Sequence, residues 1–565
     1  MRFFKKVRLD FLFALFCGFI TSVSISAQSS VTLDSFNPDV NDTVRALAMQ
    51  PDNKIIIGGS FITVSGQTRN RLARINSDGT LDSSFNPNAD DKVNAVTLQS
   101  DGKILVGGMF TSVGGTGRDS LARLNPDGTL DTSFNANILN NDLFFPTDVK
   151  AIVLQRDGKI IICGLFRTIA GQERRFLARL NADGSFDNTF KPNINGTVFT
   201  AVEQPDGKIL IGGQFIVDPG QPRNHLARLN ADGSLDNNFN PGADGDVTAF
   251  AIEPDGQILV GGSFSSIAGQ EQRRIARLNT NGTFDTSFRP TMESISFVNT
   301  IALQANGKIL IGGFFGYFIN GRIQAYIGRL NADGSIDDSF NLGTDGEVFA
   351  LQIQPDGKVL VGGFFLRVGS QTRNRLARLN NNTPVSQTLS ANQNAIVWSS
   401  DGAFPDFSSV SFEQSTDGVN YTPLGSAARF ESSSNWILTG LSLPTNQNLF
   451  IRARGVLRTG QNNGSQAIIE SVQNVFLSAT PIRVSVRGRV LNNQSKNFTA
   501  RQLVALTDSQ GNSRLVLTNQ FGYYNFSGVL TGEIYTVKIF SKKHSFASQL
   551  VAVGTNIINL DFIPR

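Results

Sequence analysis

The sequence is poor in the side chains that most often carry chemistry. It has two cysteines and two histidines in 565 residues, and the histidines, His225 and His544, lie far apart in the chain. No histidine cluster or HExxH pattern is available to bind a metal, and no convincing Ser/His/Asp set can be assembled. Cys163 interrupts an apolar segment, KIIICG, where a small packing residue is expected more often than a nucleophile. We therefore predict no catalytic residue, no metal ligand and no cofactor.

The sequence also lacks an apolar run long enough to cross a bilayer, which takes about 20 residues. FLFALFCGFI, at residues 11–20, follows a basic start and precedes a small-residue stretch that includes Ala27. This pattern predicts a secretory signal peptide over residues 1–27 and an exported protein that is secreted, periplasmic or surface-associated. Cys163 is the one cysteine left after cleavage, so no intrachain disulfide can form and stability must come from a packed core.

The chain has little net charge of either sign. The formal charge is +4, but residues 1–27 hold four basic side chains and one acidic side chain, so the mature chain is near +1. A protein this close to neutrality has no field able to capture a polyanion. We therefore expect no nucleic-acid partner. The short apolar run described above also predicts no transmembrane segment. The sequence leaves the oligomeric state open.

What the sequence has in excess is internal repetition. A short pattern, DGKIL followed by a glycine pair and an aromatic residue, occurs seven times with small changes, at spacings of 49 to 56 residues. Each unit holds four strand-length segments, which in the second copy are residues 93–99, 103–110, 121–125 and 129–135. Four strands in about 50 residues is the size of one propeller blade. We therefore predict an all-β fold with a seven-bladed β-propeller over residues 31–382. The marker position of the repeat is Lys54, Lys103, Lys159, Lys208, Gln257, Lys308 and Lys358.

Two features of the repeat predict its geometry. The PDG before the lysine is typical of a three-residue hairpin loop with a left-handed glycine, and the glycine pair lets neighbouring backbones approach closely. Residues 33–38, LDSFNP, match the fourth segment of a unit but precede the first complete unit, whereas the seventh unit ends after its third segment at residues 375–380. We therefore predict that the N-terminal strand completes the last blade and closes the ring.

Charged side chains recur at fixed places in the third and fourth segments. An intervening three-residue loop places Arg74 opposite Asp82, and such cross-strand pairs contribute roughly 0.2–1 kcal/mol each. The alternating oxygens of Asn76, Asp78 and Asp82 also leave a calcium loop open, although the arginine beside them opposes a cation. We favour the structural pairs, and ring closure then predicts that the last arginine meets the first aspartate. The predicted pairs include Arg74 with Asp82, Arg123 with Asp131, and Arg378 with Asp34.

Two of the four loop sets vary in sequence or length, namely those from the second to the third strand and those entering the first strand. In a propeller these two sets share one face, and binding residues are commonly found on irregular loops held by a rigid frame. Arginines in these loops could contact acidic glycans or carboxylates, although a solvated rim is the alternative. The candidate binding residues are Arg69, Arg118, Arg174, Arg223, Arg273, Arg322 and Arg373.

The repeat stops after residue 382, and we predict a polar linker over residues 383–394. Residues 395–479 alternate like the strands of a small sandwich. Through Trp398, the LSLP turn and the FIRAR strand they resemble a fibronectin type III or related immunoglobulin-like module.

A further change of pattern begins at residue 482. Residues 482–565, with the segments VRGRVL, VALTD and TNQFGYYNF, resemble the carboxypeptidase regulatory-like, or prealbumin-like, domain. This resemblance implies a non-catalytic β-sandwich. We therefore expect two small β-sandwich domains after the propeller.

The repeat itself resembles the delta-60 repeat family of bacterial secreted proteins, through its DGKIL-x-GG-x-F, LARLN-x-DG and LD-x-x-F-N-P segments. Its glycine pair is similar to that of kelch blades. The resemblance implies a propeller-like scaffold with no defined reaction or ligand. We interpret the protein as a secreted non-enzymatic binding or scaffold protein, whose propeller loop face recognises an extracellular glycan or protein. The alternative is a glycan-active hydrolase or lyase with its site at the propeller mouth, because the sequence alone leaves pairs of catalytic carboxylates open.

Overall fold

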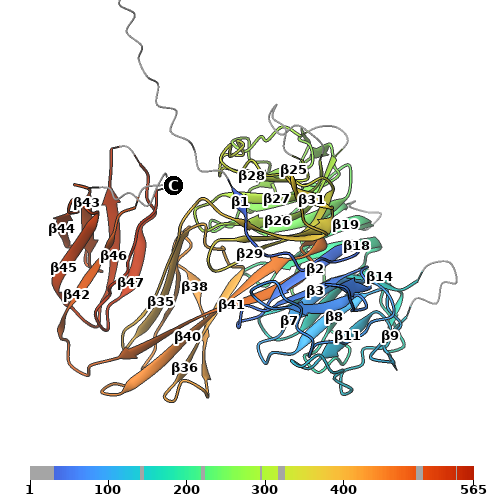
Figure 1. The fold of residues 1–565 in the computed structure, drawn as a ribbon, viewed down its shortest axis with the longest axis horizontal. Coiled ribbons are helices and arrows are strands. Elements are labelled where there is room, and N and C mark those ends of the chain that lie inside the picture. The colour runs from blue at the N-terminus through green and yellow to red at the C-terminus, as the bar shows by residue number, and fades with distance from the viewer. Residues whose placement is uncertain are drawn as a thin grey trace, which may run out of the picture.

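The computed structural model describes residues 31–139, 146–217, 223–292, 296–315, 325–491, 500–542 and 544–564. Over these ranges the regular structure is strand, apart from one short 3-10 turn, η1 (Gln461–Asn463). Figure 1 shows a propeller followed by two smaller β domains, so the all-β fold class predicted from the sequence is confirmed. The predicted signal peptide lies outside the described residues. Nothing in the described ranges forms a helix that could cross a lipid bilayer.

Each sequence repeat forms one antiparallel unit, in which the first strand pairs with the second and the second with the third. The first strands are β2 (Val44–Met49), β7 (Val93–Leu98), β13 (Asp148–Leu154), β18 (Asn195–Glu203), β21 (Val247–Ile252), β26 (Ser296–Leu303) and β29 (Glu347–Ile353). The second strands are β3 (Ile55–Gly59), β8 (Ile104–Gly108), β14 (Ile160–Leu165), β19 (Ile209–Val217), β22 (Ile258–Gly262), β27 (Ile309–Phe315) and β30 (Val359–Phe364). The third strands are β6 (Leu72–Ile75), β11 (Leu121–Leu124), β17 (Leu177–Leu180), β20 (Arg223–Leu229), β25 (Ile275–Leu278), β28 (Ile327–Leu330) and β33 (Leu376–Asn380).

Short ribbons occupy several of the loops between the second and third strands. Each places two residues opposite two others around a tight turn. They are β4 (Thr63–Val64) with β5 (Gln67–Thr68), β9 (Ser112–Val113) with β10 (Thr116–Gly117), β15 (Thr168–Ile169) with β16 (Gln172–Glu173) and with β12 (Ile138–Leu139), β23 (Ser266–Ile267) with β24 (Gln270–Glu271), and β31 (Arg367–Val368) with β32 (Gln371–Thr372).

The PDG loops form the turns that the sequence predicts. The Gly102 N–H donates to the Gln99 carbonyl at 3.0 Å, and Gly102 has a left-handed φ of 84°. Asn53 takes this place in the first unit with a φ of 64°. Asparagine is among the non-glycine residues that adopt this conformation most readily, so one turn geometry serves all seven units.

The glycine pair has two separate causes. Every first strand carries a β-bulge, which in the first unit lies between Val44 and Ala46. A Cβ on Gly59 would lie 2.0 Å from the Thr43 carbonyl oxygen beside this bulge, whereas a Cβ on Gly58 would lie 2.7 Å from Val93 of the next blade. The first glycine therefore admits the neighbouring blade, and the second admits the bulge.

The fourth segment of each unit is shorter than predicted. Leu81 forms a single bridge with Ile75, and the chain then turns, because Asp82 Oδ1 accepts hydrogen bonds from the Ser84 N–H and hydroxyl. The prediction of a full fourth strand, as at residues 129–135, is therefore wrong in extent. A short polar side chain that bonds its own backbone two residues ahead ends the strand.

The ring closes through the N-terminal strand. β1 (Thr32–Leu33) pairs antiparallel with β33, with Thr32 opposite Asn380 and Leu33 opposite Leu379. The first strands contact one another in cyclic order, and β29 of the last blade contacts β2 of the first. The predicted seven-bladed propeller, closed by its N-terminal strand, is confirmed.

Two β-sandwiches follow the ring. The middle domain packs β34 (Val385–Ala391), β35 (Ala395–Gly402), β39 (Trp436–Thr439) and β38 (Ala428–Arg429) against β37 (Thr422–Ser426), β36 (Ser409–Ser415), β40 (Asn448–Thr459) and β41 (Ser465–Phe476). The last domain packs β42 (Arg483–Arg489) and β45 (Tyr523–Leu530) against β44 (Ser513–Leu517), β43 (Leu503–Thr507), β46 (Ile534–Phe540) and β47 (Gln549–Ala552).

The predicted linker is part of the middle domain. Residues 383–394 contain β34, which pairs with β35 along its length, so the prediction of a linker there is wrong. The segment is polar, but its Leu389 and Ala391 are buried against the sandwich core. Two buried side chains on one edge strand give too weak a pattern to indicate a strand from sequence.

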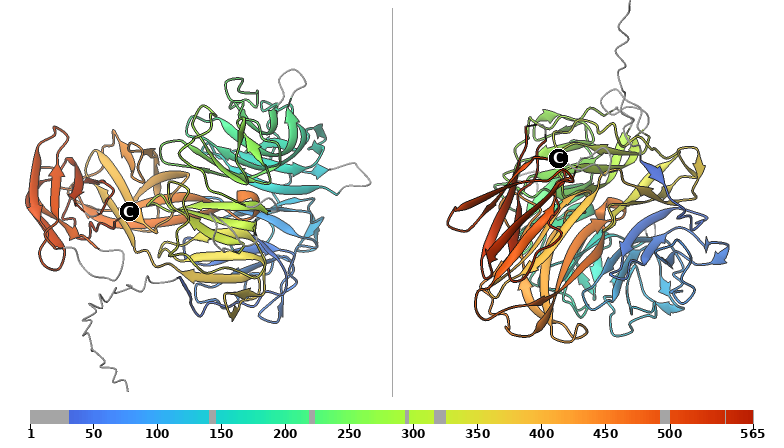
Figure 2. Two further views of the ribbon diagram at one scale, coloured as in Figure 1. Left: turned by 90° about the horizontal axis from the view of Figure 1, so that it is seen from above. Right: turned by 60° about the vertical axis from the view of Figure 1, so that its left-hand side comes forward.

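A long hairpin of the middle domain enters the propeller (Figures 1 and 2). β40 continues to Thr459 and β41 starts at Ser465, so the first strand of the hairpin runs well beyond the FIRAR segment that the sequence indicates. The hairpin end, with η1 at its tip, contacts the first strand of all seven blades. Asn463 accepts a hydrogen bond from the Ile301 N–H and donates one to the Ile301 carbonyl, and the Gly464 carbonyl accepts one from the Ile152 N–H. The hairpin therefore occupies the axis of the ring.

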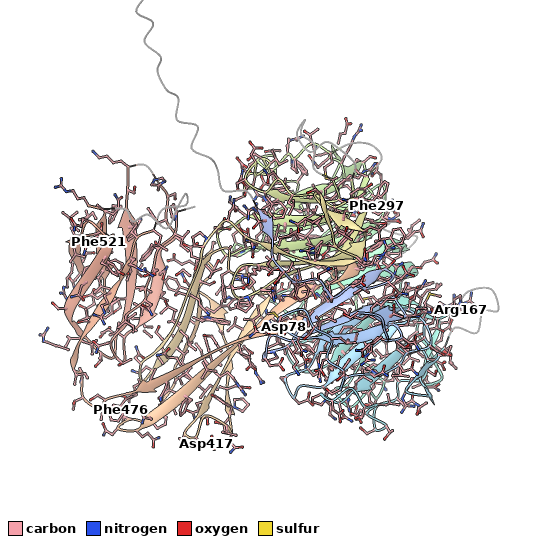
Figure 3. All side chains as sticks on the ribbon, in the orientation of Figure 1. Asp78, Arg167, Phe297, Asp417, Phe476 and Phe521 are labelled. Atoms are coloured by element: carbon pink, nitrogen blue, oxygen red, sulfur yellow. The ribbon has the colours of Figure 1, made fainter. Side chains whose placement is uncertain are left out.

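The two faces of the propeller differ in what covers them. We call the face of the turns after the first and third strands the docked face, because the middle domain lies against it. The Ala305 N–H, in one such turn, donates to the Phe404 carbonyl. The opposite face, which carries the irregular loops, is the variable face. In Figure 3, Asp78 of the docked face lies toward the middle domain, whereas Arg167 and Phe297 of the variable face lie away from it.

Candidate functional site

The repeated arginine and aspartate meet in every blade, and the repeated lysine joins them except in the fifth blade, where Gln257 takes its place. Arg74 Nε lies 2.8 Å from Asp82 Oδ2, and Lys54 Nζ lies 2.9 Å from the same oxygen. The Arg74 guanidinium also lies over Phe85, 4.6 Å from the ring centroid. The sequence predicted the arginine–aspartate contact but missed the lysine and the aromatic ring. Equivalent arginine–aspartate pairs are Arg123–Asp131, Arg179–Asp187, Arg228–Asp236, Arg277–Asp285, Arg329–Asp337 and Arg378–Asp34.

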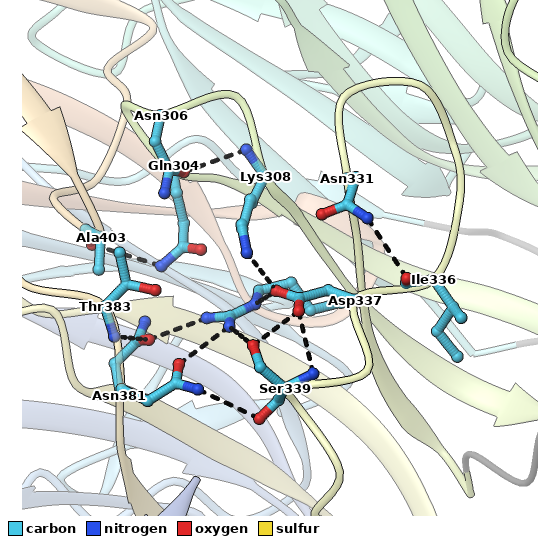
Figure 4. Close-up of polar contacts among 12 residues, drawn as sticks. Gln304, Asn306, Lys308, Asn331, Ile336, Asp337, Ser339, Asn381, Thr383 and Ala403 are labelled. Atoms are coloured by element: carbon cyan, nitrogen blue, oxygen red, sulfur yellow. Dashed lines mark hydrogen bonds and ion pairs between the residues drawn. The ribbon is translucent and has the colours of Figure 1, made fainter. Parts of the chain in front are cut away.

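The cluster of the sixth blade shows the electrostatic balance (Figure 4). Asp337 accepts from Arg329 Nε at 2.7 Å, from Lys308 Nζ at 2.6 Å and from the Ser339 hydroxyl at 2.6 Å. Burial raises the pKa of the Asp337 carboxyl, but Arg329 and the hydrogen bonds from Lys308 and Ser339 outweigh it and bring the pKa to about 2. The carboxylate is therefore ionised at neutral pH and fully engaged by its own blade.

Each of these arginines also reaches the next blade. Arg74 Nη1 donates to the Pro126 carbonyl at 2.7 Å, and Arg378 Nη1 donates to the Ser77 carbonyl at 2.7 Å across the closure. In the sixth blade Arg329 Nη1 donates instead to the Asn381 side chain at 2.8 Å. The clusters thus join strands within a blade and blades within the ring, which is a structural role.

The loops that could resemble calcium sites have their oxygens engaged in the turn. Asp78 Oδ1 accepts from the Thr80 N–H at 2.9 Å and from the Thr80 hydroxyl at 2.7 Å. These bonds lower the pKa of Asp78. Across the described ranges, no three His, Cys, Asp or Glu side chains gather into a group that could hold a metal ion.

Several of the candidate binding arginines are buried. Arg69, Arg118 and Arg223 donate through Nη2 to main-chain carbonyls of the fourth segment in their own blades, at 3.2 or 3.3 Å. Arg373 reaches the Asp34 carbonyl in the same way at 2.7 Å. These four guanidinium groups hold the fourth segment in place, and their Nη2 atoms are directed into the protein.

Two of the seven candidates do not share this position. Arg322 lies outside the described residues. In the fifth blade, the position equivalent to Arg69 is occupied by Gln272, which donates to the Ile275 and Pro290 carbonyls. Arg273 is the next residue along the chain. Arg273 itself is partly exposed and lies 3.2 Å from Glu271. The seven arginines therefore do not form one equivalent set.

Arg174 of the third blade differs from its equivalents. Its guanidinium lies over Phe186, 5.1 Å from the ring centroid, while its buried Nε lacks a hydrogen-bond partner as in Arg69, Arg118 and Arg373. Its Nη1 donates to the Glu173 carbonyl of its own loop. In the first blade Leu81 occupies the place of Phe186, and Arg69 turns inward to the fourth segment. The larger aromatic side chain keeps Arg174 at the surface.

Two grooves of the variable face flank Arg174. One is also lined by Gln172, Phe186, Asn188 and Lys191. The other is lined by Glu173, Arg174, Arg175, Ile194, Asn195 and Ile216 among others, at the boundary with the fourth blade. Basic, amide and aromatic groups thus meet at this blade. The fifth blade also has an aromatic and a basic residue at the Phe186 and Lys191 positions, Phe284 and Arg289, but Gln272 replaces the arginine there.

A polar belt lies at the variable-face end of the central channel, the space along the axis of the ring that the hairpin occupies. It is formed by the polar members of the bulge residues. Two of them bond the start of the next first strand: Asn94 donates to Asp148 at 2.6 Å and Asn299 donates to Glu347 at 2.8 Å. Arg45 Nη1 donates to Gln461 at the hairpin tip at 2.8 Å. This belt was not predicted from the sequence, although the residue type at the bulge position of the first strand varies from repeat to repeat while the neighbouring positions change little. The bulge residues are Arg45, Asn94, Lys150, Phe199, Thr248, Asn299 and Phe349.

Cys163 and His225 have structural surroundings. Cys163 is buried at the place of the first repeat glycine, and burial raises the pKa of its thiol to about 12, which keeps the thiol protonated. His225 Nδ1 lies 3.0 Å from the Gly213 carbonyl and 3.3 Å from Asp246 Oδ1. The hydrogen bond with Asp246 raises the pKa of His225.

The repeats match a known family model. Its description is "Domain of unknown function (DUF5122) beta-propeller", and it matches residues 50–85, 99–134, 155–190, 204–239, 253–288, 304–340 and 354–382. Each match begins near the turn before a second strand, so the matches follow the blades one by one. Seven segments of the chain, one in each blade, therefore match this β-propeller family model. The delta-60 name and the two sandwich resemblances stay predictions.

Comparison with curated proteins found no match. Similar solved structures include the Bacillus anthracis TIE protein, at 13% identity over 32% of this chain and 40% of that chain, with a TM-score of 0.13. They also include the major pilin subunit of Bacillus cereus (9% identity, 46% and 95% coverage, TM-score 0.13) and the group B streptococcus pilus 2b backbone protein (9%, 48% and 97%, TM-score 0.13). This chain thus spans two fifths of the first of these proteins. TM-scores this low carry no argument about fold or function.

Proposed function

We propose that the protein is an exported, non-enzymatic binding protein whose variable face recognises an extracellular glycan or protein. The observation that carries the proposal is the coverage of the other face. The middle domain lies on the docked face, and the hairpin fills the axis by contacting all seven first strands. The variable face is therefore the part of the propeller that remains for a partner, and its loops differ from blade to blade as a specific surface requires.

The third blade is the part of this face best suited to an acidic glycan. Arg174 and Lys191 supply positive charge beside one groove, and Gln172 and Asn188 supply amide groups for hydroxyls. A guanidinium binds carboxylates through paired hydrogen bonds. Arg174 is more exposed than Arg69 or Arg118, and its Nη2 does not donate to the fourth segment as theirs do, so this nitrogen can bind a ligand.

Glycan-array binding with a matched pair of variants tests this function. Arg174→Gln removes the charge beside the groove, and Arg273→Gln removes a partly exposed arginine from the corresponding loop of the fifth blade. We expect retention of carboxylated glycans by the wild type, about tenfold weaker binding by Arg174→Gln, and no change in Arg273→Gln. Equal loss in both variants would place the ligand elsewhere on the face, and no retention of any glycan or surface protein would overturn the proposal. Release of shortened sugars during the assay would favour the hydrolase or lyase instead.

A further inference from the structure

Arg458 is a partly buried cation that has no carboxylate partner among the described residues. It lies near the end of β40, inside the propeller, where Nη2 donates to the Ala201 carbonyl at 3.0 Å and Nη1 to the Ile152 carbonyl at 3.4 Å. Its Nε is buried and has no hydrogen-bond partner. No carboxylate among the described residues forms an ion pair with it.

The same strand provides an internal comparison. Arg452 Nε donates to Glu413 at 2.6 Å, and Arg454 Nε donates to Glu470 at 2.6 Å. All three arginines are partly buried, and Arg458, which lies nearest the hairpin tip, is the one that forms no ion pair among the described residues. Buried charges in proteins are normally paired, because removal from water without compensation costs several kcal/mol.

Arg458 remains charged despite its surroundings. Burial lowers its pKa to about 10, and the one neighbour that opposes this effect is the Cys163 thiol. Because that thiol stays protonated at neutral pH, it supplies no negative charge. The described residues therefore supply no negative charge in contact with this cation, and its exposed part is open to an anion in solution.

A cavity lies beside Arg458, at the junction of blades two to four with the hairpin. We call it the junction cavity; its volume is about 220 Å³, and its polar lining includes Ser100, Gln155, Glu203, Ser411, Arg454 and Arg458. On the same measure one water needs roughly 10–15 Å³, so the cavity has room for a small organic molecule. Ser100 is exposed to solvent, so the cavity can be reached from outside.

The cavity wall also carries hydrogen-bond acceptors that could bind a donor group of a ligand. The buried Oε1 of Gln155 has no hydrogen-bond partner, while its Nε2 donates to Glu203 at 2.9 Å. Gln155 and the Glu203 carboxylate can accept hydrogen bonds, whereas the Arg458 guanidinium donates them. A molecule that satisfies both sides carries a negative group at one end and hydrogen-bond donors at the other.

We propose that the junction cavity is a binding site for a small hydroxycarboxylate, with the carboxylate held by Arg458 and its hydroxyl groups donating to Gln155 and Glu203. The ligand would touch blades two to four and both strands of the hairpin at once. Its binding would therefore hold the middle domain on the propeller, in addition to any recognition at the variable face.

Calorimetric titration of the full chain tests this site with three matched probes. Gluconate has the carboxylate and the hydroxyls, sorbitol has the hydroxyls alone, and hexanoate has the carboxylate alone. We expect binding of gluconate, at least about tenfold weaker binding of the other two, and a similar loss for gluconate in Arg458→Gln. Arg452→Gln, on the same strand but outside the cavity, and Arg174→Gln, on the variable face, should bind gluconate like the wild type.

Two results would overturn the site. One is gluconate affinity that is absent, or equal in Arg458→Gln and the wild type. The other is a crystal structure grown with gluconate in which the junction cavity holds water alone, a measurement that does not depend on the folding of any variant. A bound gluconate whose carboxylate lies within hydrogen-bond distance of Arg458 would support it.

Discussion

Arg378 Nε lies 2.6 Å from Asp34 Oδ2, although 344 residues separate the two along the chain. The same guanidinium lies over Phe36, 4.6 Å from the ring centroid, and donates through Nη1 to the Ser77 carbonyl of the first blade. One side chain of the last repeat therefore holds the N-terminal strand and the first blade together. Every other blade makes the equivalent contacts within a continuous chain, so this is the place where the ring depends most on side chains.

Reversing the charge of either partner should weaken the closure. We expect Asp34→Arg or Arg378→Asp to lower the free energy of unfolding by about 2 kcal/mol, because each leaves a half-buried charge facing its like. The double variant should restore part of this loss, but not all, since an aspartate at position 378 can neither cover Phe36 nor reach Ser77. Denaturant unfolding of the four proteins measures the coupling, and a double variant no more stable than the worse single one would contradict the pairing.

The fit of the hairpin in the channel can be tested with a single methyl group. A Cβ on Gly464 would lie 2.7 Å from the Lys150 carbonyl oxygen and 3.0 Å from Ala151. Because the backbone of Gly464 is right-handed, with a φ of −80°, Gly464→Ala introduces a clash without backbone strain. We expect a loss of about 1–3 kcal/mol and faster proteolysis of the hairpin.

Gly117 offers the matched control for this substitution. A Cβ there would meet no atom within 4 Å, and the residue lies in a surface ribbon. Gly117→Ala should therefore leave stability and proteolysis unchanged. If Gly464→Ala behaved like Gly117→Ala, the hairpin would not be packed in the channel.

Stability should fall in acid because of the blade clusters. The pKa of Asp285 and of Asp337 is about 2 in the folded protein, below the ordinary value of 3.8. A carboxyl with a depressed folded pKa binds protons more readily when unfolded, so its stabilisation is complete above pH 4 and is lost as the pH falls toward 2. Urea unfolding at pH 7, 4, 3 and 2 should show this decline. Asp337→Asn should be less stable at pH 7 and should decline less steeply; a decline unchanged from the wild type would assign the acid sensitivity to other groups.

Cys163 should not react while the protein is folded. Its thiol is completely buried and its pKa is raised to about 12, so neither access nor thiolate is available. We expect iodoacetamide to leave the Cys163 peptide unmodified in buffer at pH 8 and to modify it fully in denaturant, as read by mass spectrometry. Modification in buffer at the rate seen in denaturant would show that the third blade opens locally.

The repeated parts of the molecule could be predicted because the same sequence pattern occurs seven times, so each unit supports the interpretation of the others. The turn at Gly102, the register of Arg74 with Asp82 and the phase of residues 33–38 follow from local spacing. The Lys54 contact with Asp82 could not be found in this way, because it joins segments 28 residues apart whose relation depends on the twist of the blade. Arg69 and Arg174 show the same limit, since equivalent positions point inward in one blade and outward in another according to whether leucine or phenylalanine lies beside them.

The sequence by itself determined the number of blades, their turns and the closure of the ring, because these depend on short-range patterns repeated seven times. Only the tertiary structure decided which face stays open and what fills the axis. The hairpin at residues 456–470 occurs once, and its polar tip bonds to backbone groups of Ile152 and Ile301 that every strand carries. A contact to a backbone group does not require a particular side chain at that position. Such a contact therefore depends on where the strand lies in space and cannot be read from residue type.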